Sequence, residues 1–99
     1  MDDVIKGLVR IEKDRAVVKY GYYNSDHEFI SVLKEEIEEV VSDVRKLRDR
    51  YKLLWQDIKK DGVISEIEID QLKYPAEHAI TELIQVIAVL EKYRDNINK

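Results

Sequence analysis

Carboxylates are concentrated near the middle of this sequence. The stretch LKEEIEEV (residues 33–40) contains four glutamates. When the surrounding apolar residues are placed at heptad positions a and d, Glu36, Glu39 and Asp43 form one line beside the apolar seam. The other two glutamates of the stretch fall farther toward solvent. Like charges at one-turn spacing repel, so this line needs a cation or a basic partner, unless it is a solvated or ion-paired helix face.

A second group of polar residues occurs late in the chain, where His78, Glu82 and Gln85 follow one another at spacings of four and three. If this face packs against the acidic one, several oxygens converge. Magnesium is held in proteins by a few carboxylates and waters, and substrate phosphates complete its shell. Glu36, Glu39 and Glu82 would be sufficient ligands. His78 is either a ligand or a boundary histidine, and Gln85 is either a ligand or a hydrogen-bond donor that bridges the helices.

The acidic line continues into residues that suit a phosphate chain. Asp43 could share the ion, and Lys46 and Arg50 follow at similar spacings, where they could hold phosphate. A divalent ion there would polarise a phosphoryl oxygen, orient an attacking water and neutralise a nucleotide's charge. We therefore expect a nucleotide as ligand and Mg²⁺ as cofactor, with Mn²⁺ as the alternative ion.

The elements that must position these residues are helices. Apolar residues recur at alternating steps of three and four through four heptads, which predicts one long central helix. Ser25 and Glu28 form a capping box at its start, and Gly62 ends it in the left-handed conformation. A helix over residues 25–60 would be about 53 Å long, so we expect a homodimer, or a tetramer, to cover the rest of its seam. The predicted seam is Ile30, Leu33, Ile37, Val40, Val44, Leu47, Tyr51, Leu54 and Ile58.

A second capping box, Ser65 with Glu68, opens the last helical segment. Pro75 interrupts its apolar stripe, and we predict a kink or break near Tyr74, with residues 65–73 as a short separate helix.

The N-terminal segment is expected to form a less regular helix that ends in KYGYYNS (residues 19–25). Within that loop, Tyr22, Tyr23 and Asn24 are candidates to contact a base or a partner. Trp55 and Tyr51 lie on or beside the seam and are assigned to packing.

Composition limits the fold and the partners. The chain of 99 residues is expected to form one domain, residues 1–99. With 44% hydrophobic and 38% charged residues, three Gly and one Pro, it suits an all-α helical bundle of three to four helices. The net charge of −4 gives no general attraction to nucleic acid or to an anionic membrane. Cysteine is absent and no apolar run could span a bilayer, so we expect a cytoplasmic protein without membrane or direct nucleic-acid partners.

The two acidic motifs also suggest a family. EEIEEV, followed later by TELIQVIAVL, resembles the MazG-like all-α nucleoside triphosphate pyrophosphohydrolases, including small members of bacteria and their phages. The resemblance covers roughly residues 22–93. It matches Glu36 and Glu39 to the family's E-x-x-E pair and Glu82 to the first position of its E-x-x-D pair. It implies a magnesium-dependent hydrolase that converts a nucleoside triphosphate to its monophosphate and pyrophosphate as a dimer or tetramer.

Two alternatives remain beside this interpretation. Gln85 stands where the family has aspartate, and an amide oxygen is a poorer, uncharged magnesium ligand. The chain could therefore be a catalytically inactive helical module for protein–protein interaction or nucleotide sensing. Separately, DIKKDGVISEIE (residues 57–68) resembles an EF-hand calcium loop. Lys59 occupies a ligand position of that loop, and a helix end, a glycine turn and a capping box explain the same residues.

Overall fold

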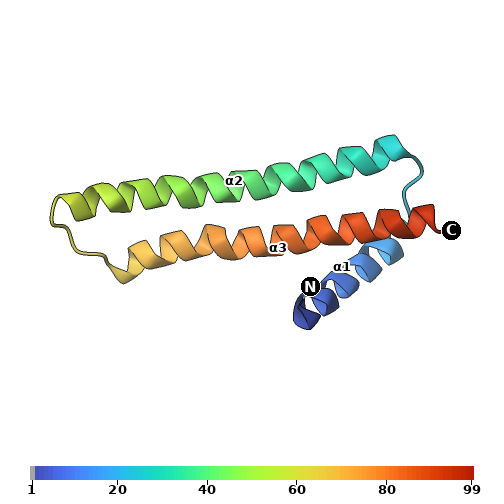
Figure 1. Cartoon of the computed structure of the whole chain (residues 1–99), viewed down its shortest axis with the longest axis horizontal. Coiled ribbons are helices and arrows are strands. Elements are labelled where there is room, and N and C mark those ends of the chain that lie inside the picture. Colours follow the sequence, from blue (N-terminus) through green and yellow to red (C-terminus); the bar gives the residue numbers. More distant parts are fainter. Residues whose placement is uncertain (1) are drawn as a thin grey trace.

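Three helices account for nearly all of the computed structural model, which describes residues 2–99. They are α1 (Asp3–Tyr20), α2 (Asp26–Lys59) and α3 (Glu66–Ile97), and no strand occurs among the described residues. α2 and α3 form a long antiparallel hairpin, and the molecule measures 60 × 28 × 22 Å (Figure 1). The prediction of an all-α fold is therefore confirmed, and the long helix predicted in the middle of the sequence is α2.

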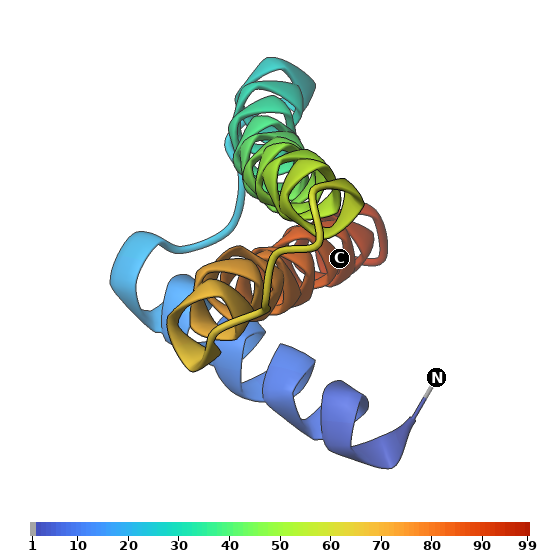
Figure 2. The ribbon, with the colours of Figure 1, turned by 90° about the vertical axis from the view of Figure 1, so that its left-hand side faces the viewer.

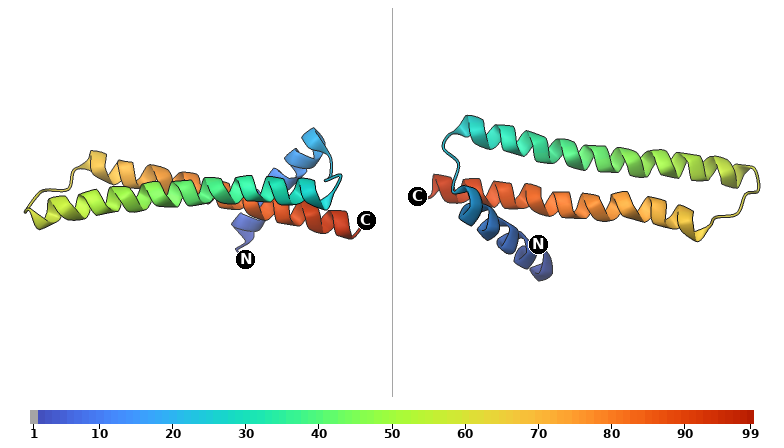
Figure 3. Two further views of the ribbon diagram at one scale, coloured as in Figure 1. Left: turned by 90° about the horizontal axis from the view of Figure 1, so that it is seen from above. Right: turned by 180° about the vertical axis from the view of Figure 1, so that it is seen from behind.

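α3 is the central element of the bundle. Both α1 and α2 pack closely on α3, whereas within residues 2–99 no Cα atom of α1 lies within 8 Å of one in α2. The end-on view shows α3 between the other two helices (Figure 2). Seen from above and from behind, α1 crosses α3 obliquely near the C-terminus (Figure 3). The bundle is consequently open on the side between α1 and α2.

Only half of the predicted α2 seam is covered within one chain. Leu33, Val40 and Leu47 are half-buried, and they face α3 because α3 is the only helix on which α2 packs closely. The residues that alternate with them remain exposed, and the polar residues Glu36 and Asp43 lie in the covered interface instead. The exposed seam residues are Ile30, Ile37, Val44, Tyr51 and Ile58.

The start of α2 follows the predicted cap only in part. The Ser25 side chain accepts a hydrogen bond from the Glu28 amide at 3.1 Å. The Glu28 carboxylate, however, accepts from Asn24 Nδ2 at 3.2 Å rather than from the Ser25 backbone. Because the Glu28 carboxylate is hydrogen-bonded to the Asn24 amide group, only one of the two hydrogen bonds of the predicted capping box forms.

The turn after α2 corrects the prediction for Gly62. The residue with the left-handed backbone is Asp61, whose φ is 61°. Gly62 is required for a different reason, namely close approach to the helix end. Its amide donates to the Asp57 carbonyl at 2.8 Å, and a Cβ added at Gly62 would lie 2.7 Å from that same oxygen.

α3 begins with the complete capping box that the sequence predicted. The Ser65 side chain accepts from the Glu68 amide at 3.2 Å, and Glu68 accepts from the Ser65 amide at 3.1 Å. The Glu68 carboxylate, which an EF-hand would use for calcium, is thus engaged in the cap.

A kink or a break was predicted near Tyr74, and the break is wrong, because α3 is continuous through Pro75. The kink stays a prediction. The proline removes one backbone donor, but Leu72 and Ala76 on either side of it are half-buried. Packing on both sides of the proline offsets the loss of a single hydrogen bond. Residues 65–73 therefore do not form a separate helix.

The loop between α1 and α2 is fixed against the end of α3. α1 ends at Tyr20, as predicted, and Gly21 follows with a φ of 72°. The Tyr23 amide donates to Asn96 Oδ1 at 3.2 Å, and Asn96 Nδ2 donates to the Tyr23 carbonyl at 2.7 Å. Phe29 stacks on Tyr93 with ring centroids 3.8 Å apart. These contacts position Tyr23 close to α3, where it is buried.

The close approach at Gly62 predicts that the effect of a Gly→Ala change on stability depends strongly on which glycine is replaced. Gly62→Ala should lower the free energy of unfolding by about 1–3 kcal/mol, because its Cβ meets a backbone oxygen that cannot rotate away. Gly7→Ala in α1 should be neutral or stabilise by up to about 1 kcal/mol, because nothing lies within 4 Å of the added Cβ. Urea denaturation of both variants measures the difference, and equal effects would contradict the assignment.

Candidate metal centre

The pairing of α2 with α3 assembles three glutamates into one carboxylate cluster. Glu36 and Glu39 come from α2 and Glu82 from α3, and one carboxylate oxygen of each lies within 4.8 Å of the others. Glu82 is only 7% exposed, Glu36 is half-buried and Glu39 is exposed at the edge. Two distant stretches of sequence therefore meet as predicted, and their oxygens face a common point.

Full ionisation of the three glutamates is unfavourable. The pKa of Glu82 is raised to about 7 by a hydrogen bond shared with Glu39, by burial, and by the charges of Glu39 and Glu36. Burial, and then the charge of Glu39, raise the pKa of Glu36 as well. At neutral pH the cluster thus favours a proton or a cation.

Gln85 contributes to the cluster as a hydrogen-bond donor. With its NH₂ group toward the carboxylates it donates to Glu36 and to Glu82, each at 3.0 Å. The opposite orientation would set an amide oxygen against two carboxylate oxygens. Of the two roles open from the sequence, the bridging donor fits this geometry, and Gln85 holds one carboxylate from each helix in place.

Asp43 lies outside the cluster and is paired with His78. Asp43 is 5% exposed, and the His78 Nδ1–H donates to its Oδ2 at 2.6 Å. This hydrogen bond is the main cause that raises the pKa of His78. The other ring nitrogen, Nε2, lies 3.9 Å from Glu82 Oε1. The histidine therefore connects the second buried carboxylate to the cluster.

Lys46 and Arg50 are grouped with His78, not with the three glutamates. The three side chains line an open groove of about 550 Å³ between α2 and α3, which we call the basic groove. Its other lining residues are Asp43, Gln71, Tyr74 and Pro75. Because His78 also lies close to Glu82, the basic groove adjoins the carboxylate cluster at one end.

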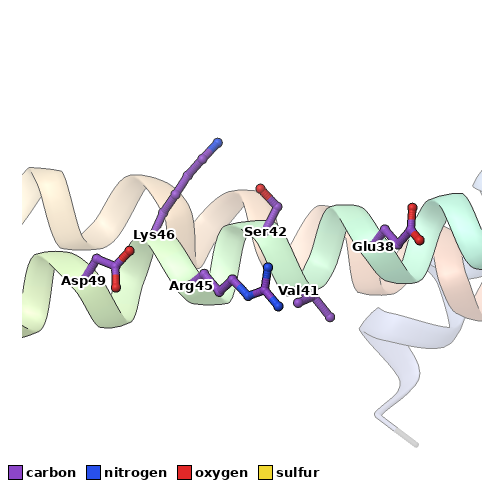
Figure 4. A pocket seen from close by; sticks show the side chains of 6 residues that line it. All are labelled: Glu38, Val41, Ser42, Arg45, Lys46 and Asp49. Carbon is purple, nitrogen blue, oxygen red and sulfur yellow. The ribbon is translucent and has the colours of Figure 1, made fainter.

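A hollow on the outer side of α2 is a poorer candidate (Figure 4). It has a volume of about 510 Å³, and its side chains all project from one helix. They are Glu38, Val41, Ser42, Arg45, Lys46 and Asp49. Without an opposing wall, this surface cannot enclose a ligand.

A cavity of about 450 Å³ adjoins the opposite end of the cluster, in the opening between α1 and α2. We call it the tyrosine pocket, since Tyr20 and Tyr23 line it together with Lys92. Glu36 and Gln85 belong to both the pocket and the cluster. The remaining lining residues are Glu12, Ala16, Glu28, Val32, Glu35, Ala88 and Val89.

Lys92 was missed by reasoning from the sequence. It is 5% exposed and is one of three charged residues that are buried among residues 2–99. Its position was nevertheless readable, because the line of His78, Glu82 and Gln85 continues by steps of four and three to Val89 and Lys92. Tyr23, a candidate contact from the sequence, lies beside it with its ring centroid 4.2 Å from Lys92 Nζ.

Comparison with models of protein families, with curated proteins and with solved structures finds no match for this chain. The MazG-like resemblance therefore rests on the sequence motifs alone. Among the described residues, no helix combines the length and apolar character needed to cross a bilayer.

The raised pKa of Glu82 predicts how metal-free stability depends on pH. Between its ordinary value of 4.5 and about 7, the folded state binds more protons than the unfolded state. The free energy of unfolding should therefore fall as pH rises through that window, by at most about 3 kcal/mol, and level off above it.

Glu82→Gln should remove this contribution, since the amide does not titrate. Urea denaturation in a chelator at several pH values from 5 to 8 gives the comparison. Glu77→Gln, on the exposed side of α3 near Lys73, is the matched control and should keep the wild-type slope. Parallel pH profiles for wild type and Glu82→Gln would contradict the assignment.

Proposed function

We propose that this protein is a magnesium-dependent nucleotide pyrophosphohydrolase of the MazG-like type. Glu36, Glu39 and Glu82 would hold the ion, with Mn²⁺ as a substitute, and a nucleoside triphosphate would be hydrolysed to its monophosphate and pyrophosphate. The supporting observation is the meeting of three carboxylates from two helices, one of them buried with a pKa near neutrality. A cytoplasmic location follows from a nucleotide substrate.

The chemistry fits the arrangement of these groups. Magnesium prefers oxygen ligands and keeps several waters, so three carboxylates leave room for phosphate. In the proposed reaction, water oxygen bonds to the α-phosphorus, and the bond to the bridging oxygen breaks. Pyrophosphate leaves with the electron pair, and a carboxylate of the cluster takes the proton from the attacking water. Bound magnesium supplies charge neutralisation and orients the water.

In this proposal the basic groove holds the pyrophosphate that leaves. Lys46, Arg50 and His78 offer donors along one side of the cluster, and within residues 2–99 no carboxylate lies within 4.0 Å of Lys46 or Arg50. Charge-assisted hydrogen bonds from such donors suit phosphate oxygens. We assign the β- and γ-phosphates to the basic groove. In this proposal Asp43 orients His78 rather than sharing the ion.

The enzyme assignment predicts that one cluster carboxylate is needed for turnover. Glu39→Gln should lower pyrophosphate release from nucleoside triphosphates in magnesium by at least about tenfold, because it removes a charged ligand. Pyrophosphate release is measured for wild type and variant across a panel of nucleoside triphosphates.

Glu38→Gln is the matched control, since it makes the same change at the neighbouring residue. Glu38 is exposed and lies 3.8 Å from Lys34, away from the cluster. Its activity should equal that of the wild type. Equal rates for Glu39→Gln and wild type would remove the enzyme assignment.

The exposed part of the α2 seam supports a homo-oligomer, a dimer or a tetramer. Ile30, Ile37, Val44 and Tyr51 recur along one side of α2 and are each about half exposed or more. A stripe of this length on one helix is typical of a surface that packs against another helix. A second copy of the chain presents the same stripe and could pack against it around a two-fold axis.

Ile37→Asp tests this assembly, because it places a charge in the middle of the stripe. Sedimentation equilibrium should show a wild-type dimer or tetramer and at least a tenfold weaker association for the variant. Ser42→Asp, on an exposed polar position of α2, should associate like the wild type. A wild-type protein that is monomeric at tens of micromolar would contradict the proposal.

The second candidate is a catalytically inactive helical interaction or nucleotide-sensing module. The donor role of Gln85 favours it, because the amide already satisfies one oxygen of Glu36 and one of Glu82. Calorimetric titration with magnesium and a non-hydrolysable nucleotide analogue separates the two. Binding without pyrophosphate release from the natural triphosphates supports the sensor, and binding with release supports the enzyme.

A further inference from the structure

Lys92 is a largely buried cation that lines the tyrosine pocket. It is 5% exposed, yet among the described residues no carboxylate lies within 4.0 Å of its Nζ and no hydrogen bond from it is formed. The face of the Tyr23 ring lies 4.2 Å from Nζ. Burial lowers the pKa of Lys92, although the charge of Glu28 favours the protonated lysine. The lysine's methylene groups are covered, whereas Nζ, which has no hydrogen-bond partner in the protein, is not enclosed and faces a cavity that a ligand could enter.

The position of the tyrosine pocket relates it to the carboxylate cluster. Along α3 the lining residues run from Lys92 through Ala88 to Gln85, and Gln85 contacts the cluster. Beyond the cluster, on the opposite side, lies the basic groove. A nucleotide with its phosphates at the groove and its α-phosphorus at the cluster would therefore direct its sugar and base into the tyrosine pocket.

The lining of the tyrosine pocket limits the ligand. Glu12, Glu28, Glu35 and Glu36 disfavour a free anion, and the ammonium of Lys92 disfavours a simple cation. A neutral ring with both hydrogen-bond donors and acceptors fits both kinds of group. The exposed ring of Tyr20 provides a face for stacking, which contributes about 1–3 kcal/mol per base in proteins that bind nucleic acid, whereas the buried Tyr23 ring contacts Lys92 Nζ.

We propose that the tyrosine pocket binds the base of the nucleotide and selects cytosine or guanine, with Lys92 donating to the ring carbonyl and a glutamate accepting from the exocyclic amino group. Adenine has no carbonyl, and uracil and thymine have no exocyclic amino group, so each leaves one side of the pocket unsatisfied. A buried polar group left without a partner is the strongest source of discrimination in such sites. This inference rests on the proposed function for the orientation of the nucleotide, but the pocket can be tested without metal or turnover.

The test uses nucleosides, which lack phosphate, in the presence of a chelator. Cytidine, guanosine, adenosine and uridine are titrated into the ¹⁵N-labelled protein, and amide shifts around residues 20–23 and 85–92 are followed. Cytidine and guanosine should bind at least about tenfold more tightly than adenosine and uridine.

Three variants make the result specific to the pocket. Lys92→Met should remove the preference among the four nucleosides. Ala16→Leu should weaken all of them by filling the cavity without changing its charge. Lys73→Met, an exposed lysine of the same helix that lies 3.4 Å from Glu77, should bind like the wild type. Thermal denaturation establishes whether each variant is folded. If Lys92→Met does not fold, Ala16→Leu serves as the test.

The outcomes separate this inference from the proposed function. If the wild type releases pyrophosphate but binds no nucleoside at these residues, or binds all four equally, the base pocket is overturned and the enzyme stands. If nucleoside selectivity depends on Lys92 but no triphosphate is hydrolysed, the pocket stands and the enzyme falls. Unchanged selectivity in Lys92→Met, or tighter binding of spermine than of any nucleoside, would also overturn the base pocket.

Discussion

The antiparallel contact between α2 and α3 buries charge, and the arrangement of the site depends on how each charge is compensated. Asp43 receives a hydrogen bond from His78, so it needs nothing further. Glu82 accepts a hydrogen bond from Gln85, but its hydrogen bond with Glu39, burial and the neighbouring charges still raise its pKa to about 7. Lys92 has an aromatic ring beside it and the charge of Glu28 in the same pocket, but no hydrogen bond to either. The protein therefore compensates its buried charges less completely from the basic groove to the tyrosine pocket. A bound ligand would contribute more stabilisation in the same direction.

Much of the fold follows from periodicity. The heptad pattern and the capping residues predicted the limits of α2 to within a residue, because these are local preferences of the chain. One error arose where tertiary packing decides the outcome, and the other at a helix end. Pro75 does not break α3, since packing on both sides of it outweighs one missing hydrogen bond. Asp61 rather than Gly62 takes the left-handed conformation, and Gly62 is needed because its amide donates to the nearby Asp57 carbonyl at the end of α2.

The carboxylate cluster could be predicted because helical spacing decides which residues share a face. The register between α2 and α3 could not be predicted. It depends on the turn between the two helices and on which half of the α2 seam packs against α3 of the same chain. Asp43 illustrates the difference: it lies on the predicted line, but the register sets it opposite His78 rather than among the glutamates. Lys92 was overlooked because a lysine within an apolar stripe is usually a side chain that extends to solvent.

The open bundle also couples ligand binding to folding. Among the described residues only five apolar side chains are buried, whereas three charged ones are, so the packing within one chain contributes little stability. An ion between α2 and α3 would stabilise the helix pairing by neutralising the carboxylates that oppose it, and anything that binds only the folded state adds to the free energy of unfolding. A base in the tyrosine pocket would do the same for α1, because that pocket occupies the opening where α1 and α2 fail to meet. Residues that weaken the protein without a ligand would then be the same ones through which a ligand stabilises it.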